Sequence, residues 1–481
     1  MSSLRKKTVS GLFWTFTQQF SVQAINFVVQ LILARLLVPE DFGIIAMLSV
    51  FIAIGNTLVD NGLTSSLIRT KDADQADYST VFFMNLSASI GIYLIVFFCA
   101  PLIAKFFKQP ILTDVIRLYT TTFIIRAFSQ VQQTKLTKEM QFRLQMTVQI
   151  PSVIIAGIGG IIMAYKGLGV WALVWMALMQ TSVSSLQLWL RSDWHPSLIF
   201  SLEKLKAHLN FGYKLTLSSL LNTLFNNVYN IVIGRYYSAA QLGFYNRADT
   251  LRMFPIQNLA TALNKVTYPM FASIQDDDAK LRSAYSILMK QVLFWLAPVM
   301  AILVIVAEPL FRLLLTDKWL PAAPYFQLLC LAGLLYPIHA YNLNILNIKG
   351  RSDLFLRLEI IKKIIVVIGV ICAIPFGIFG LIYFQIVSSI LSFFINTYYS
   401  GRLIAYNTLT QLLDIAPIFI IAATIGCGIG WINENIVHQL SLPDYLVISI
   451  VGFVYLCLYF LTSYLFGIAA VRDFKNFILK R

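Results

Sequence analysis

Long apolar runs alternate with short polar breaks along the whole chain. We expect a helix over each run, because about 20 apolar residues are long enough to cross a bilayer. None of the runs has the short alternation of polar and apolar residues that is typical of a barrel strand. The chain is therefore predicted to be an all-α, polytopic membrane protein with about 14 transmembrane helices. These helices cover residues 11–37, 42–65, 79–104, 112–131, 146–165, 168–190, 212–234, 251–274, 287–314, 323–345, 358–376, 378–400, 411–432 and 445–470.

Composition and charge agree with this prediction and add a topology. Of 481 residues, 58% are hydrophobic and 12% are charged, and the mean hydropathy is +0.74. The net charge of +15 comes from Lys and Arg scattered between apolar runs, which argues against a nucleic-acid partner. An even number of helices places both termini on one side. With that side cytoplasmic, most basic residues lie in cytoplasmic connections, as the positive-inside rule requires.

The sequence contains an internal repeat. LARLLVPEDFG at residues 33–43 matches IGRYYSAAQLG at residues 233–243, and further similarities pair 100–107 with 307–314 and 166–187 with 376–396. Each repeat holds six helices, so both enter the membrane in the same direction and enclose a central cavity. We predict an N-terminal six-helix lobe at 1–200, a C-terminal six-helix lobe at 201–405, and two additional transmembrane helices with a basic cytoplasmic tail at 406–481.

Side-chain amides recur on one face of the first predicted helix and of its repeat mate. They are Gln19, Gln23, Asn26 and Gln30, and then Asn222, Asn226 and Asn230. An unsatisfied amide that faces lipid costs several kcal/mol, so these faces must turn toward other helices or water. Hydrogen bonding between helices explains any single amide equally well. The long stripe on the first helix instead favours a hydrated path, because packing between helices rarely needs an amide on every turn.

Three charged residues, Arg126, Lys265 and Asp60, are the candidates for a position well inside the membrane. A charge at the bilayer centre costs about 2.5 to 3.5 kcal/mol, so such residues usually face a cavity or pair with each other. Arg126 and Lys265 are predicted to line the substrate path, where they suit an anionic group such as a diphosphate. Two interpretations of Asp60 stay open. It either pairs structurally, with Lys265 or a backbone end, or takes part in proton or sodium coupling.

The segment from Ala34 to Leu86, which begins ARLLVPEDFGIIAML, resembles bacterial polysaccharide transporters of the multidrug/oligosaccharidyl-lipid/polysaccharide (MOP) flippase superfamily, in particular the colanic-acid exporter type of lipopolysaccharide biosynthesis protein. The resemblance implies a multi-pass flippase of the bacterial inner membrane. Its substrate would be an undecaprenyl-diphosphate-linked oligosaccharide for O-antigen, capsule or exopolysaccharide, moved by alternating access. The implied partners are this lipid-linked oligosaccharide, membrane lipids, and a glycan polymerase with its export machinery. No cofactor is implied beyond a proton or sodium gradient.

Other functions compete with this interpretation. A multidrug or small-molecule antiporter on the same scaffold would need acids along the cavity, and Asp60 is the single acid well inside a run. A membrane enzyme of glycan assembly, such as a polymerase or ligase, would need a substantial outer loop, and all connections are short. A scaffold without transport activity is a third alternative. GxGxxG, GxxxxGK[ST], HExxH and GxSxG motifs are all missing from the sequence, so we predict that the protein is not an enzyme.

Overall fold

The computed structural model describes residues 2–60, 62–440 and 442–471. Within these ranges it does not describe the side chains of residues 2–10, 12, 211, 214, 215, 260–266 and 438. All regular elements of the described part are helical, which confirms the all-α prediction there. The chain forms two compact units, Met1–Gly243 and Phe244–Arg481, here called unit 1 and unit 2.

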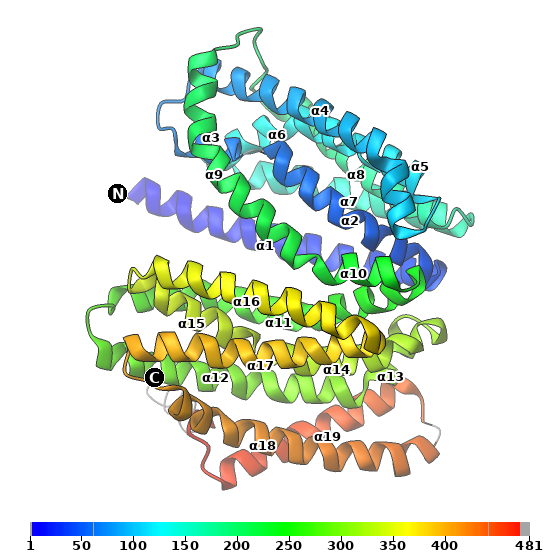
Figure 1. Cartoon of the computed structure of the whole chain (residues 1–481), viewed down its shortest axis with the longest axis vertical. Coiled ribbons are helices and arrows are strands. Elements are labelled where there is room, and N and C mark those ends of the chain that lie inside the picture. Colours follow the sequence, from blue (N-terminus) through cyan, green and yellow to red (C-terminus); the bar gives the residue numbers. More distant parts are fainter. Residues whose placement is uncertain (1, 61, 441, 472–481) are drawn as a thin grey trace. The chain divides into compact units, whose positions relative to one another are not determined.

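Unit 1 contains ten helices in its described part (Figure 1). They are α1 (Ser2–Leu36), α2 (Pro39–Asp60), α3 (Leu63–Arg69), α4 (Gln75–Phe107), α5 (Leu112–Tyr119), α6 (Thr121–Lys138), α7 (Phe142–Tyr165), α8 (Val170–Arg191), α9 (Leu202–Asn226) and α10 (Val228–Tyr236). Helix α7 packs against both α1 and α8, and α6 packs against α4 and α8. Helix α9 lies along α2, α3 and α4.

Unit 2 begins within α11 (Ala239–Ser273) and ends beyond the last helix. Its other α-helices are α12 (Asp278–Ile305), α13 (Ala307–Leu314), α14 (Ala323–Gly333), α15 (Tyr336–Ile348), α16 (Ser352–Ala373), α17 (Gly377–Leu403), α18 (Thr408–Ile432) and α19 (Asp444–Leu465). Short helical turns cover Asp317–Ala322, Ile374–Phe376, Asn433–Val437 and His438–Leu440. Helices α14, α15 and α16 pack on α17, while α18 packs on α12 and α19 packs on α13 and α18.

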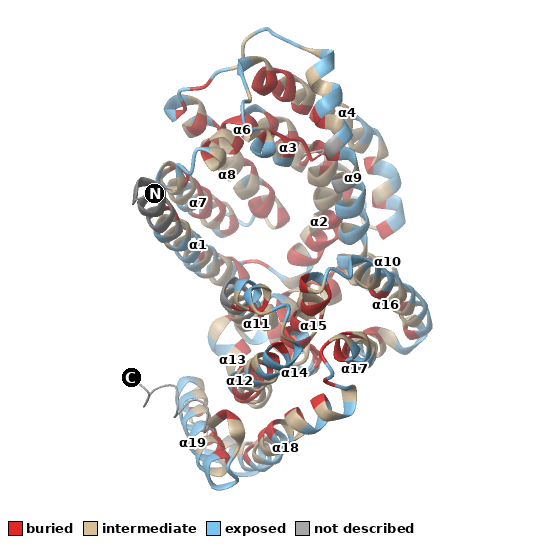
Figure 2. Ribbon diagram, turned by 90° about the vertical axis from the view of Figure 1, so that its left-hand side faces the viewer, coloured by how far each residue is buried: buried red, intermediate tan, exposed pale blue. Residues whose placement is uncertain are grey.

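The two C-terminal helices are anchored to unit 2 by a polar cluster. The Tyr406 hydroxyl donates to Asp414 of α18, and the Ser286 hydroxyl of α12 donates to the same carboxylate at 3.0 Å. Lys290 of α12 lies 3.7 Å from Asp414. Exposed residues cover much of the outer surface of α18 and α19 (Figure 2), including Phe453 at 71% exposure. Large exposed apolar side chains on these helices are those expected to face lipid.

Every predicted apolar run coincides with a helix or with two consecutive helices. Several runs that the periodicity predicts as single helices are divided in the structure, between α2 and α3, α5 and α6, α9 and α10, α12 and α13, and α14 and α15. Periodicity continues through such breaks because a one- or two-residue interruption barely changes the apolar pattern. The predicted ends of the undivided helices are mostly within a few residues of the observed ones.

By length and composition, nine segments of the described chain are suited to crossing a membrane. Among the described α-helices of at least 18 residues, four lie outside these segments, namely α6, α8, α9 and α11. Three of the four, α6, α9 and α11, carry predicted path residues, and a helix with a polar seam is poorly suited to lipid on all sides. The protein is thus a multi-pass membrane protein, and the number of 14 spans stays a prediction.

The helix ends around the repeated motif recur with an offset of 200 residues. Helix α1 ends at Leu36 and α10 at Tyr236, and α2 begins at Pro39 and α11 at Ala239. The glycine of each motif lies against the backbone of the other. A Cβ added to Gly43 would be 1.8 Å from the Ala239 carbonyl oxygen, and one added to Gly243 would be 1.9 Å from that of Pro39. Glycine therefore permits this contact at both positions. The lobe boundaries at 200 and 405 stay a prediction. By their contacts, α9 and α10 belong to unit 1.

Candidate functional site

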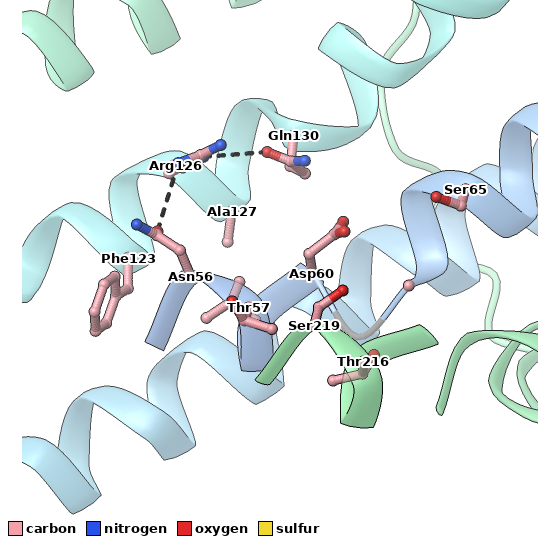
Figure 3. Close-up of a pocket in the computed structure, with 12 residues that line it drawn as sticks. Asn56, Thr57, Asp60, Ser65, Phe123, Arg126, Ala127, Gln130, Thr216 and Ser219 are labelled. Carbon is pink, nitrogen blue, oxygen red and sulfur yellow. Dashed lines mark hydrogen bonds between the residues drawn. The ribbon is translucent and has the colours of Figure 1, made fainter. Parts of the chain in front are cut away.

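A polar pocket of about 330 Å³ lies within unit 1, between α2, α3, α6 and α9 (Figure 3). It is lined by Asn56, Thr57, Val59, Asp60, Gly62, Ser65, Phe123, Arg126, Ala127, Gln130, Thr216 and Ser219. Most of these side chains carry an amide, hydroxyl or charged group. The pocket brings Arg126 and Asp60, two of the residues predicted from the sequence, into one site.

Hydrogen bonds connect Arg126 to Asp60 along the pocket. The Arg126 guanidinium donates to Gln130 Oε1 at 3.4 Å and to Asn56 Oδ1 at 3.5 Å (Figure 3). Gln130 Nε2 donates to Thr64 Oγ1 at 3.2 Å, and the Thr64 hydroxyl donates to the Asp60 carboxylate. Arg126 and Gln130 are four residues apart on α6, a spacing that places both on one face of the helix. The contacts of Arg126 are long and weak, so the guanidinium keeps most of its capacity to donate.

Arg126 is exposed and has only neutral oxygen atoms as hydrogen-bond acceptors in the part of the chain that the structure describes. An arginine keeps its positive charge at any physiological pH. Because no carboxylate lies within ion-pair distance of it among these residues, its charge is available to an anion that enters the pocket.

The pocket forms where the second predicted helix is interrupted. Helix α2 ends at Asp60 and α3 begins at Leu63, so Asp60 lies at a helix end, whereas the periodicity predicts a single helix over residues 42–65 with Asp60 inside it. Gly62 has φ of +66°, a left-handed conformation that favours glycine. A Cβ at Gly62 would also lie 2.6 Å from the carbonyl oxygen of Gly212 on α9. The close approach of these two glycines brings α9 against the broken helix.

The first helix places its predicted path residues elsewhere. Gln19 and Asn26 are exposed, and Gln23 and Gln30 are partly buried. Helix α7 packs against a different side of α1, where Val29 meets Gly157. None of the four amides lines the pocket around Arg126.

The repeat-related amides and the second cation are also outside the pocket. Asn222 and Asn226 are exposed residues of α9, and Asn230 is a partly buried residue of α10. Their regular spacing predicts one continuous helix, but the helix is divided at Asn227, whose side-chain amide donates to the Thr223 carbonyl oxygen at 2.8 Å. Lys265 belongs to α11, and its side chain is outside the described residues.

A second pocket, of about 750 Å³, lies within unit 2 between α12, α14, α17 and α18. Its walls are almost entirely apolar, with Met300, Leu331, Phe393 and Phe419 among the lining side chains. A cavity of this chemistry favours a hydrocarbon ligand over a hydrated one.

Some residues of the pocket lie in polar segments of the sequence, although the pattern of apolar residues does not single them out. Asn56, Thr57 and Ser65 belong to the polar segment IGNTLVDNGLTSS, and Thr216 and Ser219 to the segment TLSS. Hydroxyl residues are common in membrane helices and often bond to their own backbone. Helical spacing alone does not reveal which of them meet in space.

The polysaccharide biosynthesis protein family has a model that matches residues 32–324. The chain is 28% identical over 404 residues to lipopolysaccharide biosynthesis protein WzxC of Escherichia coli (strain K12). The aligned region covers 82% of this chain and 81% of that protein. It is 24% identical to teichuronic acid biosynthesis protein TuaB of Bacillus subtilis (strain 168), over 89% of both chains. It is also 25% identical to succinoglycan biosynthesis transport protein ExoT of Rhizobium meliloti (strain 1021), over 70% of this chain and 69% of that one.

Two solved structures share the fold. Lipid II flippase MurJ, in an inward closed conformation, superposes with a TM-score of 0.68 at 14% identity, over 95% of this chain and 98% of its own. An inward-facing multidrug resistance MATE family transporter of the MOP superfamily has a TM-score of 0.60 at 17% identity, over 79% of this chain and 95% of its own. These similarities show that the chain shares the fold of these two proteins.

Proposed function

The chain belongs to the polysaccharide biosynthesis protein family, and on this premise we propose that it is a flippase for an undecaprenyl-diphosphate-linked oligosaccharide. The relatives are named for the biosynthesis of extracellular polysaccharides, and one of them is named as a transport protein. The substrate would be a repeat unit of O-antigen, capsule or exopolysaccharide. The family and the fold support transport rather than an enzymatic reaction.

The pocket around Arg126 is the observation that carries the proposal. A diphosphate needs a cation that is not already neutralised, and a guanidinium can bind two phosphate oxygens at once. The surrounding amides and hydroxyls offer the donors and acceptors that sugar hydroxyls require. The apolar pocket of unit 2 supports a substrate that also has a hydrocarbon part.

The remaining path residues belong to the same proposal. Lys265 would be a second cation for the diphosphate. The amides of α1, and Asn222, Asn226 and Asn230, would bind the glycan as it crosses the membrane. Exposure of Gln19, Asn26 and Asn226 supports this role, because amides that hydrogen-bond only to neighbouring helices are normally buried.

Asp60 is the residue on which a second candidate function depends. It lines the same pocket as Arg126 and accepts a hydrogen bond from Thr64. A carboxylate there suits coupling to a proton or sodium gradient, and a multidrug or small-molecule antiporter would use it in the same way. If coupling occurs at this residue, Asp60→Asn will transport at the same rate with and without a gradient, while the wild type responds to the gradient.

We place the protein in the bacterial inner membrane, with both termini in the cytoplasm. The distribution of Lys and Arg supports this orientation. A glycan polymerase and its export machinery are the partners that the proposed substrate would require on the outer side.

Reconstituted liposomes test the proposed function. Full-length protein is incorporated with a fluorescent undecaprenyl-diphosphate oligosaccharide, and the fraction of label accessible to an external quencher is followed with time. We expect Arg126→Ala to slow translocation at least about tenfold, as loss of a charged hydrogen bond predicts. Arg143→Ala removes the same charge at the exposed start of α7, where Arg143 lies over the Trp14 ring. This control should leave translocation unchanged. Equal rates for both variants would refute the role of Arg126, and inactivity of folded wild type with several glycans would refute the function.

A further inference from the structure

Helix α9 meets the rest of unit 1 through a face of small and polar residues. His208, Gly212, Thr216, Ser219 and Thr223 follow one another at intervals of three or four, which places them on one side of a helix. Gly212 contacts Gly62, Thr216 and Ser219 line the pocket, and Thr223 Oγ1 lies 3.4 Å from Thr57 Oγ1. Leu217 (59% exposed) and Leu221 (48% exposed) of α9 point away from this face. Leu209 is partly buried and packs against the apolar core of unit 1.

None of the large apolar side chains described on α9 is fully buried, and Leu209 is partly buried. Among the described side chains of α9, only His208 and Gly212 are buried. Burial of apolar surface is the main non-directional interaction that stabilises the packing of helices. A helix with few buried apolar contacts is one that opens at low free-energy cost. Specific polar interactions must then hold α9 in place.

A cluster at the N-terminal end of α9, here called the α9 latch, supplies those interactions. It consists of Ser66, Asp74, Asp77, Lys204 and His208. His208 is 3% exposed, and its Nδ1 lies 2.7 Å from Ser66 Oγ of α3 and its Nε2 3.2 Å from Asp77 Oδ1 of α4. Lys204 Nζ lies 2.9 Å from Asp77 Oδ2 and 2.6 Å from Asp74 Oδ1.

The carboxylates of the latch are themselves fixed. Asp74 and Asp77 form a capping box at the start of α4, in which each side chain accepts a hydrogen bond from the backbone N–H of the other. Hydrogen bonding to Lys204 and to the Asp77 backbone holds the pKa of Asp74 well below its usual range. The capping box thus fixes the orientation of the acceptors for α9.

We propose that α9 is a detachable wall of the Arg126 pocket, and that His208 is the positioning residue whose contacts to Ser66 and Asp77 hold it closed. Opening of the latch moves Thr216 and Ser219 away from Asp60 and Arg126, so the pocket changes size during each transport cycle. This inference rests on the proposed function for its role in transport, and on the contacts of α9 for its mechanism.

One experiment joins α9 to α2 covalently. In a Thr57→Cys, Thr223→Cys double variant the two thiols replace hydroxyls that are 3.4 Å apart, within reach of a disulfide. The full-length protein is assayed in liposomes while reduced, after oxidation, and after renewed reduction. We expect oxidation to lower translocation at least about tenfold relative to the reduced protein, reversibly, because a closed wall blocks the cycle.

A matched pair of cysteines controls for the effect of a disulfide itself. Val29→Cys with Gly157→Cys joins α1 to α7, where an added Cβ at position 157 would lie 3.6 Å from the Val29 Cβ, close to the usual separation in a disulfide. Oxidation of this pair should leave translocation unchanged. Oxidised Thr57→Cys, Thr223→Cys protein that transports as fast as its reduced form would overturn the proposal.

A second measurement tests His208 without any transport assay. In the Thr57→Cys, Thr223→Cys protein, the rate at which the two introduced thiols form a disulfide reports how much of the time α9 is closed. Adding His208→Ala should slow this rate at least about threefold, because a buried hydrogen bond to a charged group is lost. His208→Gln keeps groups that can bond to both Ser66 and Asp77, so it should restore the rate. Equal rates in the three proteins would refute the role of His208. Rates that change as expected, while the wild type moves no lipid-linked glycan, would refute the proposed function alone.

Discussion

Gly62 offers a quantitative test of how the pocket is built. Substituting alanine there has two costs. A left-handed backbone conformation costs an L-residue about 1 to 2 kcal/mol, and forcing a new methyl group into a packed contact costs about 1 to 3 kcal/mol. The second cost applies because the new Cβ would be 2.6 Å from the Gly212 carbonyl oxygen and 2.7 Å from its Cα, both backbone atoms. Gly62→Ala should therefore destabilise the protein by about 2 to 5 kcal/mol.

Gly350 provides the matched control. Its φ of +68° is nearly that of Gly62, and an added Cβ would meet nothing within 4 Å. Gly350→Ala should cost only the backbone contribution, about 1 to 2 kcal/mol. For domains of 150 to 250 residues the melting temperature falls by about 2 to 4 °C per kcal/mol, so Gly62→Ala should melt about 2 to 12 °C below Gly350→Ala. Thermal unfolding of both purified proteins in detergent, followed by tryptophan fluorescence, measures the difference. Identical melting temperatures would mean that the contact between Gly62 and Gly212 does not hold α9 against the broken helix.

Three other predictions concern the repeat, the α1 amides and the C-terminal helices. Gly43→Ala should destabilise the protein by more than about 2 kcal/mol, since its Cβ would overlap the Ala239 carbonyl oxygen, whereas Gly428→Ala, with open space around it, should not; melting temperatures that agree would contradict this. Gln23→Leu combined with Asn26→Leu should lower translocation at least about tenfold at normal protein yield, and unchanged translocation would remove these amides from the path. Tyr406→Phe removes a donor to Asp414 and should cost about 1 to 3 kcal/mol, measured as faster proteolysis between α17 and α18; proteolysis at the wild-type rate would show that other contacts anchor α18.

The site residues predicted from the sequence are of two kinds. Arg126 and Asp60 stand out in the sequence because a charge in an apolar run is rare, and the structure brings both into one pocket. The α1 amides stand out through their spacing, but they line a different surface of unit 1. Residues that change the shape of the pocket, such as Gly62 and His208, have no such signal. A glycine or a histidine near a helix end is common in any membrane protein.

The local pattern of apolar and polar residues in the sequence determined the helices and the repeat. In lipid every backbone polar group must bond within its own segment, so each apolar run of sufficient length becomes a helix whatever surrounds it. The offset of 200 residues between equivalent helix ends follows from the two similar motifs alone. The helix break at Gly62, the contact of α9 with α2, and the bonds of His208 to Ser66 and Asp77 were decided by tertiary structure. Those features join residues up to 166 positions apart, and their energies come from packing and directional hydrogen bonds, which leave no period in the sequence.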